Sequence, residues 1–334
     1  MTADAAKPPA VSVVIPAHND QRYVGECVES ILSQTLSEFQ LIIVDDGSTD
    51  DTGKIADGYA AGDDRVMVIH KVEKTGRGAA RNAGIEAATA ELIAFQDADD
   101  LSAPDRLERQ KAFLDAHPEV GLVASPYMLV DEHGAEVGVK PLRRTGAALA
   151  EHMRRYCAIS HCAALFRTEV VRAVGGYRNG FAQSQDYDML LRILERAEVG
   201  VLDVPFYKYR QVPCGVSMGR VEAANRSKEI AREFARQRAE RGTDEYEVYL
   251  AAGKMPRILG AEAPASYADY YYRLSRMALD CREYGAMLRY VRLGLRGRPS
   301  WLVKYAFLLA AGAVHFVLRT VGLLDWFERT FRAR

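Results

Sequence analysis

The sequence predicts an α/β fold in which a doubly wound, mostly parallel sheet is followed by a C-terminal helical extension. Short apolar runs rich in β-branched residues, such as VSVVIPA at 11–17, are typical of strands buried on both faces. Amphipathic segments of about ten to fifteen residues separate these runs, which indicates strands joined by helices. After Gly219 only long helical patterns remain, so the sheet is expected to end before that point.

The expected strands and helices alternate along the first 130 residues. Asn19 or Asp20 can cap the first helix, and the segment STDDT at 48–52 can cap the second. Pro104 suits the first turn of the fourth helix. The strands are VSVVIPA (11–17), FQLIIVDDGS (39–48, ending in charge), RVMVIH (65–70), ELIAFQDADD (91–100, ending in a turn) and VGLVASPYMLV (120–130). The helices carry apolar residues at Val24, Cys27, Val28, Ile31 and Leu32, then at Ile55 and Tyr59, and continue at 78–90 and 104–116.

Length, charge and cysteine content limit the class of protein. The chain has 334 residues and a formal net charge of -1, which does not indicate a nucleic-acid partner. Residues 1–10 contain no apolar segment and are expected to form a flexible leader instead of a signal peptide. The five cysteines are scattered and form no Cys-x-x-Cys pair, so we expect reduced thiols in a cytoplasmic protein.

The C-terminal segment is basic and contains an apolar helical pattern at 299–327. From Cys281 to the C-terminus, ten Lys/Arg stand against three Asp/Glu, a net charge of +7. On a helix, Lys304, His315 and Arg319 lie within about 60° of one another and form a narrow polar stripe. This pattern fits an amphipathic helix on an anionic membrane surface, and it equally fits a helix packed on the preceding domain or on a second subunit.

Acidic residues follow two of the predicted strands. Asp45 and Asp46 end one, and Asp97, Asp99 and Asp100 end another. Because ligands of open α/β sheets bind outside the carboxyl ends of the strands, both clusters can face one cleft. Three aspartates within four residues repel one another, and a divalent cation such as Mg²⁺ or Mn²⁺, shared with nucleotide phosphates, relieves that repulsion. A solvated acidic turn is the alternative for each cluster taken alone.

The glycine-rich segment KTGRGAARNAG does not indicate a common nucleotide-binding loop. It lacks the Gly-Lys-Ser/Thr ending of a Walker A motif, and a dinucleotide fingerprint should directly follow the first strand. PAHND stands there instead, which disfavours NAD.

Four segments together resemble the family 2 glycosyltransferases of the GT-A fold. They are VSVVIPAHND, IIVDDGSTDDT, GRGAARNAGIEAATAELIAFQDADD and ALFRTEVVRAVGGYRNGFAQSQDYDMLLRI, in the order and spacing of that family. The resemblance covers roughly Val11 to Ser217. It implies a mixed, mostly parallel GT-A sheet, with a catalytic domain at 11–218 and a helical extension at 219–334.

The resemblance also implies which residues bind a nucleotide-sugar donor. Pro16 and Ala17, with Asp45 or Asp46, are expected to form the pocket for the base and ribose. Arg81 and Arg210 are expected to contact the donor, Arg210 at a phosphate, with plain surface roles as their alternatives. Asp97-Ala98-Asp99 matches the family's DxD motif, whose final aspartate coordinates the metal, and Asp100 is a further candidate ligand.

The segment SQDYDM resembles the family's Glu-Asp-Tyr segment, in which Asp186 corresponds to the catalytic base. A hydroxyl is a poor nucleophile, so a carboxylate that accepts its proton is what the transfer requires. Gln185 stands where glutamate is usual, which leaves the base in place. The alternative for Asp186 is a carboxylate favoured by a helix N-terminus. For His161 a structural role is expected.

The implied function is metal-dependent, inverting transfer of a single sugar from a nucleotide-sugar, expected to be a UDP-sugar, to a hydroxyl acceptor. Transfer of a single sugar is expected because the Gln-x-x-Arg-Trp motif of the processive synthases is missing. The acceptor is expected to be a polysaccharide, an oligosaccharide or a lipid-linked glycan. The protein is expected in the cytoplasm, free or held at the inner face of the membrane, and its C-terminal helices can support oligomers. The alternatives are a sugar nucleotidyltransferase and a catalytically silent scaffold that binds glycans or membranes.

Overall fold

The computed structural model describes residues 8–181, 183–211 and 221–253, together with a few single residues after them. The chain divides into two units, and the first holds residues 1–211 and 222–256. Only this first unit is described below. The predicted helix at 299–327, Ser217, Cys214 and Cys281 lie outside the described residues. Cys27, Cys157 and Cys162 are free thiols, and no helix among the described residues is long and apolar enough to cross a membrane.

The central sheet is mixed and mostly parallel, as the sequence predicts. Its strand order is β10-β6-β9-β4-β1-β2-β3. The strand β1 pairs in parallel with β2 and β4, whereas β9 runs antiparallel to both of its neighbours, β4 and β6. The bounds are β1 (Val11–Ala17), β2 (Phe39–Asp45), β3 (Val66–His70), β4 (Leu92–Phe95), β6 (Val120–Ala124), β9 (Ala164–Arg167) and β10 (Glu198–Val201).

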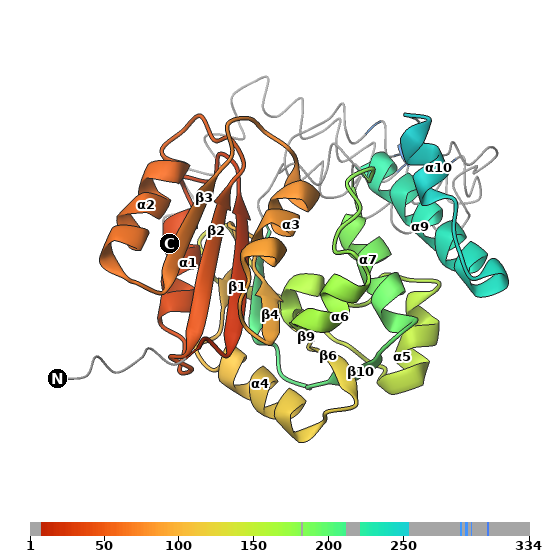
Figure 1. Cartoon of the computed structure of the whole chain (residues 1–334), viewed down its shortest axis with the longest axis horizontal. Helices are drawn as coiled ribbons and strands as arrows, with labels where there is room; N and C mark the ends of the chain where they lie inside the picture. The colour runs from red at the N-terminus through yellow and green to blue at the C-terminus, as the bar shows by residue number, and fades with distance from the viewer. Residues whose placement is uncertain are drawn as a thin grey trace. The chain divides into compact units, whose positions relative to one another are not determined.

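Helices cover both faces of this sheet because successive residues of each strand point to opposite sides (Figure 1). Val13 and Ile15 pack in one buried cluster with the apolar residues of α1, and Val14 packs in the other with those of α3. A Cβ at Gly84 would lie 2.2 Å from a methyl carbon of Val14, so only glycine lets α3 approach β1 this closely. The bounds are α1 (Val24–Leu32), α2 (Thr52–Gly62), α3 (Arg77–Ala87), α4 (Arg106–Ala116), α5 (Gly146–Met153), α6 (Thr168–Ala173) and α7 (Gln185–Leu194).

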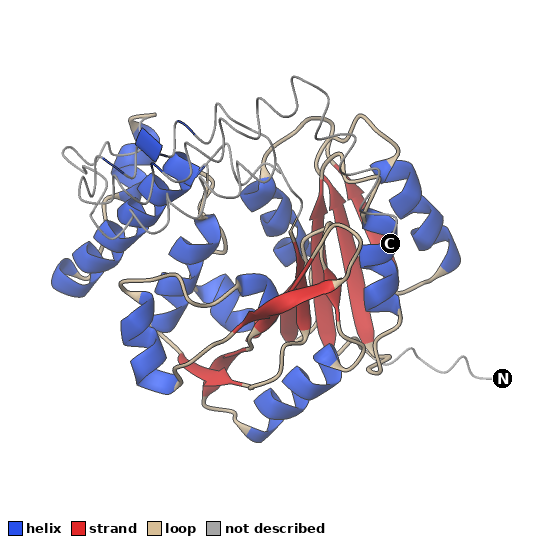
Figure 2. Ribbon diagram, turned by 180° about the vertical axis from the view of Figure 1, so that it is seen from behind, coloured by secondary structure: helices blue, strands red, loops and turns tan. Residues whose placement is uncertain are grey.

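A second, four-stranded sheet was not predicted from the sequence (Figure 2). Its order is β5-β11-β7-β8, with β5 (Leu101–Ser102), β7 (Tyr127–Val130), β8 (Glu136–Lys140) and β11 (Tyr207–Arg210). The run VGLVASPYMLV, expected as one strand, is split at Ser125 and Pro126 into β6 and β7, which belong to different sheets. Proline has no N–H for a ladder hydrogen bond, which favours a break there. The pairing of β11 with β5 brings Arg210 next to the acidic loop.

The compact first unit extends beyond the domain boundary expected at 218. The helices α9 (Val221–Arg241) and α10 (Tyr246–Ala251) follow that boundary, yet Phe234 and Tyr246 belong to the buried cluster that includes Phe181. The ring centroids of Phe181 and Phe234 lie 6.1 Å apart, edge to face. Arg178 pairs with Asp244 at 2.8 Å. The start of the expected helical extension therefore packs as part of the first unit.

The start of α1 and the first residues of the chain differ from what the sequence predicts. Tyr23, not Asn19 or Asp20, is the N-cap of α1, and no side chain caps that helix. The Asp20 carboxylate instead accepts a hydrogen bond from the His18 N–H at 2.9 Å. In the expected leader, residues 1–7 lie outside the described part, and the Ala10 N–H donates to the Glu38 carbonyl at 2.8 Å.

Candidate active site

The carboxyl ends of β1, β2 and β4 form the edge of the sheet at which the predicted site residues gather. Pro16 and Ala17 end β1 opposite Val44 and Asp45 of β2. The Asp46 N–H continues this pairing by donating to the Ala17 carbonyl at 2.8 Å. All four predicted residues of the base and ribose pocket, Pro16, Ala17, Asp45 and Asp46, therefore lie side by side.

The carboxylates at the end of β2 are bound by protein groups. Asp45 accepts from the Ser48 N–H at 3.1 Å and lies 3.1 Å from Nδ1 of His70. Asp46 accepts from the N–H groups of Thr75 and Gly76, both at 2.8 Å, and from the Thr75 hydroxyl at 2.6 Å. Burial raises the pKa of Asp46, but these hydrogen bonds outweigh burial and lower it. The loop before α3 is thus fixed to the end of β2.

Asp97, at the end of β4, is held charged by arginine. Nη2 of Arg81 lies 2.5 Å from Oδ1 of Asp97, and the guanidinium carbon is 5.3 Å from the centre of the Tyr177 ring. Burial raises the pKa of Asp97, but the positive charges of Arg81 and Arg77 outweigh it and hold this pKa well below its usual range. Asp97 therefore remains a carboxylate even though its surroundings are largely dry.

Asp99 and Asp100 differ in their partners. Asp100 is buried, and its oxygens accept from the Tyr207 hydroxyl at 2.6 Å and from the Arg210 N–H at 2.7 Å. In the described part of the chain, no other residue donates a hydrogen bond to the Asp99 carboxylate. Burial and the charge of Asp97 raise the pKa of Asp99 to about 6. Asp99 is therefore the aspartate of this loop whose carboxylate has no hydrogen-bond donor from another residue in the described part of the chain.

The Arg210 guanidinium donates hydrogen bonds to three other residues of the protein. Its Nε donates to the Asp99 carbonyl at 2.8 Å, Nη1 to the Glu132 carbonyl at 2.8 Å, and Nη2 to Oε2 of Glu26 at 2.7 Å. Its side chain is 2% exposed. These contacts place Arg210 among the residues that hold the acidic loop, and they leave no exposed face for a donor phosphate.

Asp186 lies on the first turn of α7, beside a histidine for which the sequence predicted only a structural role. Nδ1 of His161 lies 3.4 Å from Oδ2 of Asp186, whose side chain is 32% exposed. Burial raises the pKa of Asp186, but His161 outweighs it and lowers this pKa to about 2. The His161 ring also has a nitrogen within 4.8 Å of a carboxylate oxygen of Asp97. His161 thus connects the end of β4 to α7.

The importance of His161 was missed because it depends on the direction of β9. His161 starts the 3₁₀ turn η1 (His161–Ala163), which leads directly into β9. Because β9 runs antiparallel to β4, the residues before β9 lie at the carboxyl end of β4. A parallel β9 would place them at the opposite edge. The pattern HCAALFR alone does not reveal that direction.

Two comparisons of sequence define the family. A model described as "Glycosyl transferase family 2" matches residues 12–175. The putative glycosyltransferase EpsE of Bacillus subtilis is 35% identical over 207 residues, which span 61% of this chain and 73% of EpsE. This chain belongs to glycosyl transferase family 2. The uncharacterized protein y4gI of Sinorhizobium fredii is 33% identical over 266 residues, which span 78% of this chain but 28% of y4gI.

Two solved structures share the fold of this family 2 glycosyltransferase. TarS 1-349 of S. aureus in complex with UDP-GlcNAc has a TM-score of 0.54 at 18% identity, and the match covers 82% of this chain and 83% of that chain. The mannosyltransferase PcManGT of Pyrobaculum calidifontis in complex with GDP-Man and Mn²⁺ has a TM-score of 0.53 at 19% identity, covering 92% and 87%. The expected GT-A fold is confirmed.

The residues at the end of β4 suit a hard divalent cation. Asp97, Asp99 and Asp100 of this glycosyltransferase each offer a carboxylate oxygen, and these oxygens lie within 4.8 Å of one another. Carboxylates are the ligands that Mg²⁺ and Mn²⁺ prefer. A cation beside Asp99 would also favour its charged form, which burial and Asp97 oppose. The donor set therefore fits the metal that the sequence predicts.

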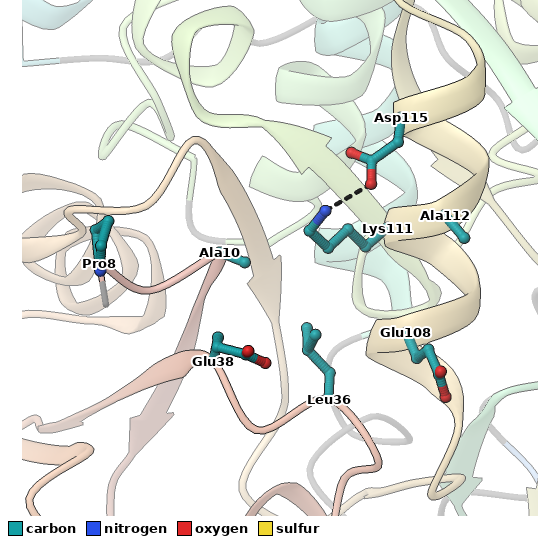
Figure 3. A pocket seen from close by; sticks show the side chains of 8 residues that line it. All are labelled: Pro8, Ala10, Leu36, Glu38, Glu108, Lys111, Ala112 and Asp115. Carbon is teal, nitrogen blue, oxygen red and sulfur yellow. Dashed lines mark hydrogen bonds and ion pairs between the residues drawn. The ribbon is translucent and has the colours of Figure 1, made fainter. Parts of the chain in front are cut away.

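A pocket of about 500 Å³ lies elsewhere on the glycosyltransferase (Figure 3). It is lined by residues that precede β1 and β2, among them Ala10 and Glu38, and by Glu108, Lys111 and Asp115 of α4. The amino ends of these strands form the edge of the sheet opposite to the acidic clusters. This pocket does not belong to the candidate active site.

Proposed function

We propose that this glycosyltransferase moves a single sugar from a nucleotide-sugar to a hydroxyl acceptor with inversion, using Mn²⁺ or Mg²⁺ and Asp186 as the general base. The observation that carries the proposal is the position of His161, which lies within 4.8 Å of Asp97 and pairs with Asp186 at 3.4 Å. It brings the acidic loop after β4 and the first turn of α7 to one site, although the two segments are far apart in sequence.

In the proposed site, the ends of β1 and β2 bind the nucleoside of the donor and the loop after β4 binds its diphosphate. Pro16, Ala17, Asp45 and Asp46 would receive the base and ribose, and Asp97, Asp99 and Asp100 would hold the cation beside the diphosphate. When bound, such a cation offsets the charge that develops on the departing nucleoside diphosphate. We propose a UDP-sugar as donor, supported by the UDP-GlcNAc bound to TarS, which has the same fold. The GDP-Man bound to PcManGT makes GDP-sugars the first alternative to test.

Two features of Asp186 support its proposed role as the base at the acceptor end. With a pKa of about 2 it is a carboxylate at neutral pH, and about a third of its side chain is accessible to an approaching hydroxyl. His161 holds one carboxylate oxygen, so the other can accept the acceptor's proton. A single displacement on the face of the sugar opposite to the diphosphate inverts the anomeric configuration. The proposed acceptor is the hydroxyl of a polysaccharide, oligosaccharide or lipid-linked glycan.

Release of nucleoside diphosphate tests the proposal. Purified protein is incubated with a panel of UDP- and GDP-sugars and Mn²⁺, with and without a glycan acceptor, and free UDP or GDP is measured. We expect release that requires the metal and increases with acceptor. A sugar nucleotidyltransferase would instead consume or form pyrophosphate, and a silent scaffold would release nothing.

The base is tested by Asp186→Asn, with Asp203→Asn on an exposed loop as the control. Loss of a general base typically reduces the rate by about 10² to 10⁴. We expect a fall of this size in kcat for Asp186→Asn, with donor binding retained, and no change for Asp203→Asn. Transfer by Asp186→Asn at close to the wild-type rate would remove Asp186 from its assigned role.

A further inference from the structure

The two arginines that the sequence assigns to donor binding, Arg81 and Arg210, both contact protein groups. Arg81 forms its ion pair with Asp97, and its side chain is 4% exposed. Arg210 donates to Asp99, Glu132 and Glu26, and its side chain is 2% exposed. Turning either buried guanidinium to a diphosphate would break its contact with Asp97 or with the Asp99 carbonyl, and a buried charged group that loses its partner is costly.

Arg77 is a third arginine at the same edge of the sheet. It is the first residue of α3 and precedes Arg81 by four residues, so the two lie on one face of the helix. The preceding residue, Gly76, donates its N–H to Asp46 at 2.8 Å. A Cβ on the following residue, Gly78, would lie 3.6 Å from Cγ of Gln185. Arg77 therefore stands between the nucleoside end of the site and the segment that carries Asp186.

Arg77 has acidic neighbours but no ion-pair partner. Its charge interacts with those of Asp97, Asp99 and Asp20, and the charge of Arg81 opposes it. Within the described residues, no carboxylate lies within ion-pair distance of its guanidinium and no hydrogen bond to its side chain is formed. Arg77 is exposed. An arginine so placed is free to bind an anionic group that enters from solvent.

The positive charges of the proposed site do not balance the negative charge of a donor diphosphate. Arg81 neutralises Asp97, and a divalent metal held by Asp99 and Asp100 would keep at most a single net positive charge. The diphosphate of a nucleotide-sugar carries two negative charges and gains a third when the sugar leaves. We propose that Arg77 binds the donor diphosphate and offsets this charge as the nucleoside diphosphate departs. The assignment rests on the proposed function and names the residue that holds its leaving group.

Binding measurements on Arg77→Gln and Arg77→Lys test this assignment. Arg109→Gln is the control, since Arg109 lies on α4 with a side chain 56% exposed. Calorimetry with UDP and with GDP, each in the presence of Mn²⁺, is compared with binding of uridine and guanosine detected by NMR. We expect the diphosphate Kd to rise about tenfold or more in Arg77→Gln, because a charge-assisted hydrogen bond is lost, and less in Arg77→Lys.

The nucleosides separate a phosphate contact from a general disturbance of the site. Their affinity should be equal in wild type, Arg77→Gln and Arg109→Gln, because nucleosides lack the phosphates. Diphosphate affinity in Arg77→Gln equal to wild type would overturn the role of Arg77 and leave the proposed function standing. Parallel losses for nucleoside and diphosphate would also overturn it. A wild-type protein that binds neither UDP nor GDP with Mn²⁺ would overturn the proposed function and this inference together.

Discussion

The acidic residues at the ends of β2 and β4 look alike in sequence but have opposite electrostatics. The segment DDGS lies at the end of β2 and DADD lies after β4, at the same edge of one sheet. Asp46 receives three hydrogen bonds from Thr75 and Gly76, and its pKa is lowered. Asp99 receives none from another described residue, and its pKa is raised to about 6 by burial and by Asp97.

The difference shows which acidic loop is complete without a ligand. At the end of β2, neighbouring backbone N–H groups satisfy the carboxylate, so the charge stabilises the fold. At the end of β4, burial and the charge of Asp97 disfavour the charged form of Asp99, which a bound cation would instead favour. Strongly perturbed carboxyl groups of this kind are typical of functional sites. The comparison predicts that removing the Asp99 carboxylate affects activity without a loss of stability, and that removing the Asp46 carboxylate lowers stability in addition to any effect on donor binding.

The largest effect is expected for Asp99→Asn. Removing this carboxylate should abolish most metal-dependent transfer, by about a hundredfold or more, because bound metal supplies several kcal/mol of stabilisation to the transition state. The free energy of unfolding should stay equal or rise, since the repulsion from Asp97 is relieved. Initial rates with saturating Mn²⁺ and urea unfolding measure the two effects. Asp105→Asn, four-tenths exposed on the turn before α4, is the control.

A stability loss without an activity loss in Asp99→Asn would reverse the comparison. It would assign the DADD loop a structural role like that of Asp46, which is the solvated-turn alternative raised by the sequence.

The sequence predicted the framework better than the site, because the two depend on interactions of different range. β1 to β4 and the helices between them are short apolar runs and amphipathic segments, which local patterns identify. The roles of His161 and Arg210 depend on β9 and β11, whose long-range antiparallel pairings no local pattern specifies. Asp97, Asp99 and Asp186 were predicted because their spacing matches a family, whereas the resemblance gives no role to Arg77, although Arg77 lies in the third matched segment.

The second effect is a loss of stability in Asp46→Asn. An amide places an NH₂ group where the carboxylate accepts from the Gly76 or Thr75 N–H, so one buried donor loses its acceptor, at a cost of about 1 to 3 kcal/mol. Urea unfolding measures the cost. Asp51→Asn is the matched control, since Asp51 is exposed in the same loop and its side chain caps nothing. Equal stability of the two variants would contradict the assignment of Asp46 to the loop before α3.

The third effect concerns His161, which joins the β4 edge to the base. His161→Ala should lower kcat about tenfold with little change in the donor KM, because one hydrogen bond to Asp186 is lost. His161→Asn should retain more activity, since its amide nitrogen can occupy the position of Nδ1. Tyr177→Phe is the control: its ring centroid lies 5.9 Å from that of His161, and its buried hydroxyl has no partner. Equal losses in the Ala and Asn variants would indicate a packing role only.

The smallest effect is a pH dependence that distinguishes the two acidic loops without any activity assay. Because the pKa of Asp99 is raised to about 6, the folded protein binds a proton there that the unfolded chain releases near pH 4. Stability contributed by Asp99 is therefore lost as pH rises through this window. Asp46, with its lowered pKa, has the opposite sign: its contribution is present at neutral pH and is lost on acidification below about pH 4.

Metal ions compete with that proton, so the stabilisation by Mn²⁺ should itself depend on pH. At pH 5 the Asp99 carboxyl is mostly protonated and at pH 7 mostly ionised, which predicts an apparent Mn²⁺ affinity about tenfold higher at pH 7. Thermal melts over a MnCl₂ titration at the two pH values measure the ratio. The ratio should fall towards one in Asp99→Asn and remain in Asp46→Asn. An equal ratio in wild type and Asp99→Asn would locate the ion away from the end of β4, and the contrast between the two loops would then be one of hydrogen bonding alone.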